Sequence, residues 1–191
     1  MKIKIAYLLT FLLISLYTGC GDKGVISKDT IVKPAKQIQP KFNLITTNNE
    51  TIQVQAIDQG LVFKGYEGKV ILLNLFGTWC PPCKAEIPHL NNIKNALTDE
   101  FEVIGIDVGL RSGGLTPMDT IKSFITQFNI QYPITSRGDN MKLQNYLRSL
   151  NASGSIPFMI LFDQKGNYIT HYIGMVPEEM MRSDIDQLLK K

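Results

Sequence analysis

The sequence has few of the residues that mark a disulfide-stapled or metal-rich protein. Its 191 residues include three cysteines and two histidines. A small secreted domain held together by disulfides carries more cysteine pairs, at wider spacing. A zinc site needs about four ligands, and His89 and His171 do not stand at finger spacing from the cysteines. Zinc binding remains an alternative, but we expect no metal.

Basic clusters, internal repeats and low-complexity tracts are missing as well. No run of Lys or Arg is interleaved with aromatic residues, so we expect no nucleic-acid partner. The formal net charge is only +3, and 44% of the residues are hydrophobic against 19% charged. This balance is typical of one folded soluble domain, which we expect to be a monomer.

The longest apolar stretch lies at the N-terminus, where residues 5–17 follow Lys2 and Lys4. It is shorter than the roughly 20 residues that comfortably span a bilayer. A positive start, a short apolar run and small residues at its end are typical of an export signal. We therefore predict a signal peptide over residues 1–19 and a domain that works outside the cytoplasm.

Cys20 follows this signal directly. Residues 16–20 resemble the lipobox of bacterial lipoproteins, although Tyr17 stands where Leu is usual. The resemblance implies an acylated Cys20 and a membrane anchor; cleavage nearby or an uncleaved signal are the alternatives. Residues 20–40 are polar, contain Pro34 and Pro40, and are predicted to form a tether.

The remaining residues, 41–191, are predicted to form one α/β domain. The pattern indicates an N-terminal hairpin, a loop or short turn region over 60–68, alternating strands and helices, and a final hairpin and helix. Such an order predicts a mixed central sheet with helices on both faces. The expected strands are 42–45, 51–56, 69–76, 101–108, 132–135, 158–162 and 167–173, and the expected helices 81–97, 118–128, 142–150 and 177–189.

Cys80 and Cys83 form a Cys-x-x-Cys pair between a buried strand and a helix. Free N–H groups and the helix dipole stabilise a thiolate there. We predict that Cys80 is the more exposed, more acidic nucleophile and that Cys83 resolves the mixed disulfide. Pro81 and Pro82 remove two N–H donors, which should limit how acidic and how oxidising the pair becomes.

The segment Gly77-Thr-Trp-Cys-Pro-Pro-Cys-Lys-Ala-Glu-Ile-Pro-His-Leu90 resembles the active-site segment of thioredoxin-like envelope reductases of the TlpA, ResA and CcmG group. The resemblance covers about residues 42–189. It implies a thioredoxin-like fold with an extra N-terminal β-hairpin and a βα insertion carrying residues 115–128. One departure precedes the motif, where residues 75–78 read Leu-Phe-Gly-Thr and many relatives carry Phe-Trp-Ala.

The family pattern also implies roles for single residues. Glu86 would be a partly buried acid that tunes the cysteine pair; a surface glutamate is the alternative. Ile156-Pro157 resembles the cis-proline loop that faces the cysteines, and would leave the backbone of Ser155 and Ile156 free to pair with substrate. Trp79 would shield the disulfide and, with Pro81 and Pro82, contact substrate, or it would simply pack.

The resemblance implies a periplasmic-side, membrane-anchored reductase of protein disulfides. Its implied substrate is apocytochrome c, its electron donor a membrane protein of the CcdA or DsbD type, and its only redox group the Cys80–Cys83 disulfide. A thiol oxidase or isomerase and a non-enzymatic copper or haem chaperone remain alternatives. A peroxidase is disfavoured, because Cys80 lacks the Pro-x-x-x-Thr-x-x-Cys frame of peroxiredoxins.

Overall fold

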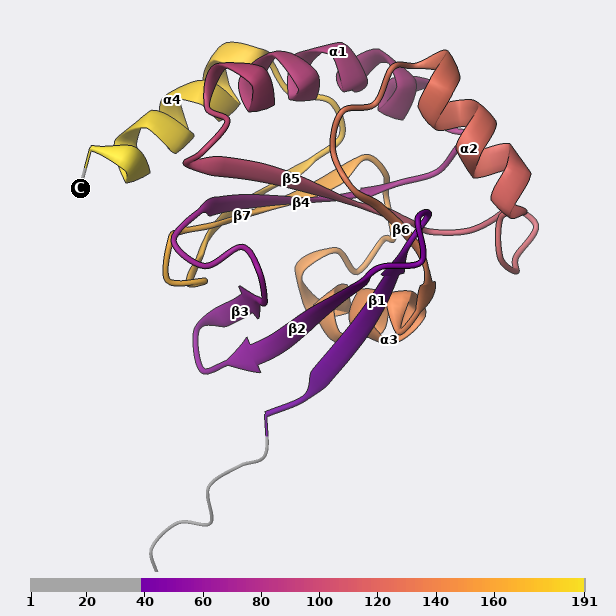
Figure 1. The fold of residues 1–191 in the computed structure, drawn as a ribbon, viewed down its shortest axis with the longest axis horizontal. Helices are drawn as coiled ribbons and strands as arrows, with labels where there is room; N and C mark the ends of the chain where they lie inside the picture. The colour runs from indigo at the N-terminus through magenta and orange to yellow at the C-terminus, as the bar shows by residue number, and fades with distance from the viewer. Residues whose placement is uncertain (1–38, 191) are drawn as a thin grey trace, which may run out of the picture. The chain divides into compact units, whose positions relative to one another are not determined.

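The computed structural model describes residues 39–190, in which one eight-stranded mixed sheet has the order β3-β2-β1-β6-β5-β4-β7-β8 (Figure 1). Strands β4, β5 and β6 run parallel, and the other neighbours are antiparallel. The strands are β1 (Lys41–Thr46), β2 (Thr51–Ile57), β3 (Gly60–Phe63), β4 (Val70–Phe76), β5 (Phe101–Asp107), β6 (Ile134–Gly138), β7 (Phe158–Phe162) and β8 (Tyr168–Ile173).

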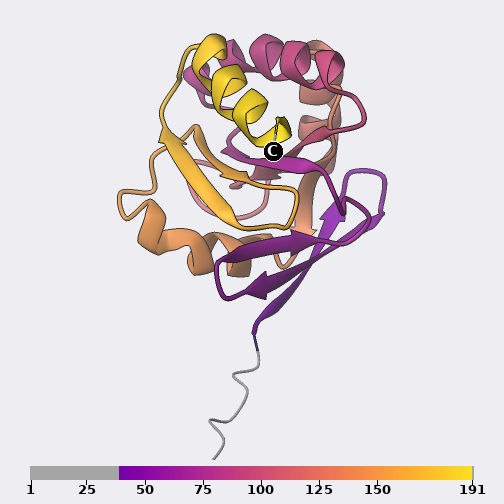
Figure 2. The same ribbon diagram turned by 90° about the vertical axis from the view of Figure 1, so that its left-hand side faces the viewer.

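Helices cover both faces of this sheet. Helices α1 (Pro81–Ala96), α2 (Met118–Gln127) and α4 (Glu178–Leu189) lie on one face, whereas α3 (Asn140–Tyr146) and the following 3-10 turn, residues 147–150, lie on the other (Figures 1 and 2). The predicted α/β architecture, a mixed central sheet with helices on both faces and an extra N-terminal hairpin, is confirmed.

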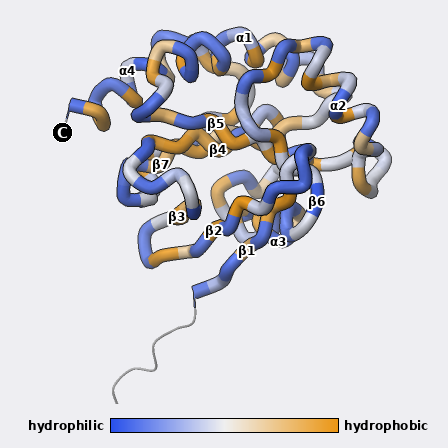
Figure 3. Tube along the Cα trace, viewed as in Figure 1, coloured by the Kyte–Doolittle hydropathy of each residue, from blue (hydrophilic) through white to orange (hydrophobic). Residues whose placement is uncertain are grey.

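Every residue of β4, β5 and β7 is buried, because helices and neighbouring strands enclose them on all sides. These strands form the hydrophobic centre of the molecule (Figure 3). Their continuous apolar sequences are typical of strands covered on both faces. The sheet separates two hydrophobic cores, one on each face, so β4 can carry α1 on a rigid support.

The segment predicted as a loop or short turn region over residues 60–68 begins with a strand, and that prediction is wrong. β3 pairs antiparallel with β2, with Val54 opposite Phe63. Leu61 and Phe63 are buried in the core, whereas Gly60 and Val62 are partly exposed. Four residues are too few for an alternation of buried and exposed positions to be distinguished from a turn in the sequence. In the structure, hydrogen bonds to the backbone of β2 make these residues a strand.

Two further elements differ from the predictions by more than one residue at an end. β6 covers 134–138 rather than 132–135, because Tyr132 packs into the core ahead of the strand and the strand continues to Gly138, which pairs with Leu44 of β1. The predicted helix over 142–150 begins earlier and divides into α3 and the 3-10 turn.

The predicted signal peptide, most of the predicted tether and the acylation site Cys20 lie outside the described residues. Within residues 39–190, no helix combines the length and apolarity that a membrane span requires.

Candidate active site

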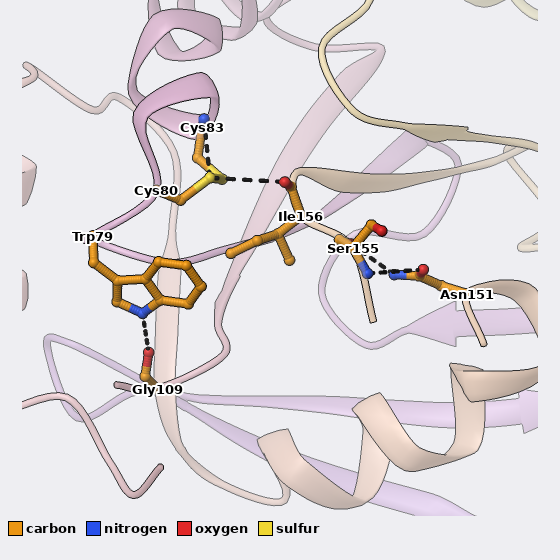
Figure 4. The surroundings of a disulfide bond; sticks show 7 residues. All are labelled: Trp79, Cys80, Cys83, Gly109, Asn151, Ser155 and Ile156. Atoms are coloured by element: carbon orange, nitrogen blue, oxygen red, sulfur yellow. Dashed lines mark hydrogen bonds between the residues drawn. A yellow bond between two sulfur atoms is a disulfide. The ribbon is translucent and has the colours of Figure 1, made fainter. Parts of the chain in front are cut away.

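The cysteine pair lies where β4 leads into α1. Cys80 is the N-cap of α1, Pro81 and Pro82 fill its first two positions, and the backbone N–H of Cys83 donates to the Cys80 Sγ at 3.3 Å. Cys80 and Cys83 form a disulfide (Figure 4). Because proline has no N–H, the two residues between the cysteines offer the Cys80 sulfur no donor. As predicted, Pro81 and Pro82 remove two backbone N–H donors from the helix end that faces the Cys80 sulfur.

The prediction that Cys80 is the more exposed thiol is wrong, since both cysteines are 2% exposed. The Cys80 sulfur faces inward and lies 3.8 Å from the carbonyl oxygen of Ile156, which covers it (Figure 4). Burial thus does not distinguish the two sulfurs. The N-cap position does, because it places Cys80 at the positive end of the helix dipole.

Gly77 explains the departure from the family pattern just before the motif. A Cβ at this position would lie 2.9 Å from the Trp79 ring and 3.2 Å from Cδ1 of Ile156. The glycine therefore lets the indole and Ile156 approach each other beside the disulfide. The bulk is supplied by Phe76, whose ring stacks on Phe124 of α2 at 5.7 Å.

The loop opposite the cysteines contains a cis Ile156–Pro157 peptide bond, as its resemblance to the cis-proline loop implies. One part of that expectation is wrong: the backbone of Ser155 is not free. Its N–H donates to Oδ1 of Asn151 at 3.1 Å, and its carbonyl accepts from Nδ2 of Asn151 at 2.8 Å. Sequence reasoning missed Asn151, which fixes this loop through a side chain that mimics a strand partner.

Trp79 lies beside the disulfide and next to the Ile156 side chain, and it is 36% exposed (Figure 4). Its indole N–H donates to the carbonyl oxygen of Gly109 at 2.9 Å, and the guanidinium of Arg111 lies 5.6 Å from the ring centroid. The glycine-rich segment after β5 therefore packs on the active-site tryptophan. A partly exposed position beside the disulfide fits both shielding and substrate contact.

A cleft of about 230 Å³ opens beside Trp79 and Ile156. Its lining combines apolar side chains, among them Leu75 of β4 and Phe158 of β7, with amide side chains and one arginine from α3 and the 3-10 turn. Because it adjoins both residues that flank the Cys80 sulfur, it can hold a side chain of a bound polypeptide. The lining residues are Leu75, Trp79, Val108, Gln144, Asn145, Leu147, Arg148, Asn151, Gly154, Ile156 and Phe158.

Glu86 lies one turn after Cys83 on the buried face of α1 and is fully buried. The burial is deeper than the partial burial that the family pattern implies. Neither carboxylate oxygen has a hydrogen-bond partner among the described residues. Burial raises the pKa of Glu86 to about 7; the nearby backbone N–H of Val176 opposes this without reaching hydrogen-bonding geometry. At neutral pH this carboxyl can therefore take or release a proton.

Two further polar side chains share the space under α1, and sequence reasoning missed both. Burial and the nearby Glu86 carboxylate raise the pKa of the Tyr132 phenol, while the Asn74 side chain partly opposes the shift. Asn74 is 2% exposed in β4. The sequence held a signal for Asn74, because it is the one polar residue in the apolar run of 70–76. Nothing in the sequence marked Tyr132.

The described residues contain no group of three or more side chains suited to hold a metal ion. His89 contacts the carboxylate of Glu178 at 2.9 Å, and His171 contacts the Tyr168 hydroxyl at 2.7 Å. Both histidines take the surface and packing positions expected for them.

Comparisons with known proteins agree with this geometry. The thiol-disulfide oxidoreductase ResA of Bacillus thuringiensis strain Al Hakam is 26% identical over 128 residues, covering 67% of this chain and 66% of that protein. A ResA of Bacillus cereus is 22% identical over 183 residues, covering 94% and 96%. A thioredoxin family thiol:disulfide interchange protein of Chlorobium tepidum TLS superposes with a TM-score of 0.59 at 20% identity, covering 78% and 94%.

The fold and the cysteine pair define a thioredoxin-fold thiol–disulfide oxidoreductase similar to the TlpA, ResA and CcmG group. A family profile described as Redoxin matches residues 34–189, and the chain belongs to this family. The predicted resemblance and enzyme class are confirmed.

Proposed function

We propose that this enzyme works as a reductase of protein disulfides. The observation that carries the proposal is the proline pair at the start of α1, which leaves the Cys83 N–H as the donor that reaches the Cys80 sulfur. A strongly oxidising pair owes its potential to a stabilised reduced form. Fewer donors stabilise the thiolate less, so the pair favours its disulfide form and gives electrons to a substrate.

In the proposed cycle, the Cys80 thiolate attacks one sulfur of a substrate disulfide, and the other substrate sulfur leaves as a thiolate. Cys83 then attacks the Cys80 sulfur and releases the second substrate sulfur. The substrate gains two electrons and becomes a dithiol, while the enzyme is left with the Cys80–Cys83 disulfide. The two protons lost by the cysteines balance those gained by the substrate.

We assign Glu86 the movement of the proton of Cys83. Its carboxyl lies one turn along the same buried face, with a pKa of about 7 that allows both forms at neutral pH. A group whose pKa lies near the working pH transfers protons most effectively. Asn74 and Tyr132 form the polar surroundings of this carboxyl.

The substrate is a polypeptide in extended conformation. Its cysteine meets Cys80, its backbone lies along Ile156, and a neighbouring side chain enters the cleft beside Trp79. We propose apocytochrome c, which the family resemblance implies, as this substrate. A membrane donor of the CcdA or DsbD type would return electrons to the enzyme, and acylation at Cys20 would hold it on the periplasmic side of the membrane.

The equilibrium reduction potential of the Cys80–Cys83 pair tests the direction of electron flow. Titration against dithiothreitol or glutathione with thiol trapping is expected to give a value near or below about −250 mV, close to that of thioredoxin. A value near about −120 mV, typical of a strong periplasmic oxidant, would overturn the reductase proposal and indicate disulfide donation instead.

A further inference from the structure

We propose that Asp107 and Thr116 are positioning residues that hold Trp79 in place, and that their contact sets how well the site accepts protein disulfides. The effect on acceptance of protein disulfides rests on the proposed function, because it concerns the binding of a protein substrate. The positioning of Trp79 concerns the structure alone. Neither residue contacts the cysteines in the interactions described above; both act through the loop that joins β5 to α2.

The loop reaches the active site at Gly109, whose carbonyl oxygen accepts the indole N–H of Trp79 at 2.9 Å. Arg111, two residues on, lies over the same ring. Val108 and Trp79 line the same cleft, so the start of this loop and the tryptophan form one continuous wall. The position of the loop therefore decides the position of the indole.

The loop is closed at its base by a buried hydrogen bond. The Thr116 hydroxyl donates to the carboxylate of Asp107 at 3.1 Å, and the two residues are 0% and 3% exposed. Arg137 of β6 donates to the Thr116 carbonyl at 2.9 Å and fixes the backbone there. Oδ1 of Asp107 accepts this bond, and Oδ2 has no hydrogen-bond partner among the described residues. The Thr116 hydroxyl is therefore the side-chain donor that pairs this buried carboxylate, and losing it would leave the carboxylate unpaired.

Between these fixed ends the loop folds back on itself. The N–H of Leu110 donates to the Gly114 carbonyl at 3.0 Å, and the N–H of Gly113 donates to the Leu110 carbonyl at 2.9 Å. Gly109 has a φ of 91°, and a Cβ there would lie 2.3 Å from the Gly114 oxygen. Gly109 and Gly114 allow this close approach of the backbone. Because the loop is tightly closed, fixing its end at Thr116 also restricts the position of Gly109.

Without the Thr116 hydroxyl, the loop keeps its contact with Arg137 but loses the bond to Asp107, so Gly109 and the indole that it holds are less firmly positioned. Substrate must then order the indole when it binds. Ordering one side chain at an interface costs about 0.5–1.5 kcal/mol, which corresponds to a roughly two- to tenfold rise in KM. The turnover rate does not depend on this ordering once the complex has formed.

The test compares Thr116→Val with Thr135→Val in the full chain. Thr135 is a matched control, because it is equally buried and its hydroxyl donates to the Gly105 carbonyl, away from the loop. Trp79 is the single tryptophan of the chain, so acrylamide quenching of intrinsic fluorescence reports on it alone. Kinetics of insulin disulfide reduction and the rate of reduction by dithiothreitol complete the comparison.

We expect Thr116→Val to increase quenching of Trp79 in the reduced protein and to raise KM for insulin by roughly two- to tenfold, with little change in kcat. Reduction by dithiothreitol, which needs no cleft, should not become slower. Thr135→Val should change neither quenching nor KM. Thr116→Ser, which keeps the hydroxyl, should restore both, so that a general loss of stability is told apart from loss of the hydrogen bond.

Equal quenching in Thr116→Val, Thr135→Val and the parent chain would overturn the proposal. A parent chain that reduces no protein disulfide would contradict the proposed function instead, and the quenching comparison would still decide whether Thr116 positions Trp79. Increased quenching with unchanged KM would overturn the claim that this contact governs acceptance of protein substrates.

Discussion

At the scale of single residues, Glu86 shows how a helical position acquires a function. Its spacing from Cys83 places it on the buried face of α1, and the sequence predicts that much. The depth of burial comes from the elements that close over it, among them the segment at Val176 and the side chain of Tyr132. Burial without a hydrogen-bond partner then favours the neutral carboxyl.

Replacing Glu86 by Gln should remove a pH-dependent loss of stability. The pKa of Glu86 rises from its ordinary value of 4.5 to about 7 on folding. Between these values the folded chain keeps a proton that the unfolded chain has lost, so the free energy of unfolding falls as the pH rises. The loss reaches roughly 3 kcal/mol above pH 7. Urea unfolding of both proteins from pH 4 to 8 measures it; parallel curves would contradict the raised pKa.

Single serine substitutions should identify the attacking cysteine, which burial does not distinguish. Cys83→Ser lacks the resolving thiol, so it is expected to accumulate a mixed disulfide between Cys80 and a disulfide-containing protein. Cys80→Ser is the matched control and should accumulate none. Non-reducing gel electrophoresis after incubation with insulin shows the adduct. The reverse pattern would make Cys83 the nucleophile.

At the scale of elements, the first turn of α1 controls the redox chemistry. An N-cap side chain accepts from the second or third N–H of its helix. Here the second position is Pro82 and the third is Cys83, so only the third donor remains. The motif revealed this arrangement, because both prolines and both cysteines are local in sequence.

Pro82→Ala should make the pair more oxidising, because it returns an N–H to the second helical position. One hydrogen bond to a charged sulfur is worth about 1.5–3 kcal/mol, which corresponds to about 30–60 mV in a two-electron potential. Pro81→Ala is the matched control, since the N–H it restores lies at the first position and is not aimed at the N-cap side chain. Equal shifts in both variants would contradict this account.

At the scale of the whole molecule, the folded domain and the proposed membrane anchor lie in different parts of the chain. The described residues contain no membrane-spanning helix, and the membrane attachment proposed here depends on Cys20 alone. Cys20→Ala should therefore abolish incorporation of labelled fatty acid and move the protein from the membrane to the soluble fraction. A variant that stays in the membrane would indicate an uncleaved signal as the anchor.

The sequence by itself determined what is local. The Cys-x-x-Cys motif, the proline pair, the face of α1 that carries Glu86, and the continuous apolar strands follow from neighbouring residues, so pattern and spacing sufficed to predict them. The fold class followed because alternating strands and helices have few ways to bury their apolar faces.

Only the tertiary structure decided what depends on segments distant in the chain. The burial of Cys80 comes from Ile156, the closure of the Ser155 backbone from Asn151, and the fixing of Trp79 from Gly109. β3 becomes a strand because β2 lies beside it. These contacts join residues that the chain brings together only when the sheet forms, and no single segment carries a pattern that encodes its partner.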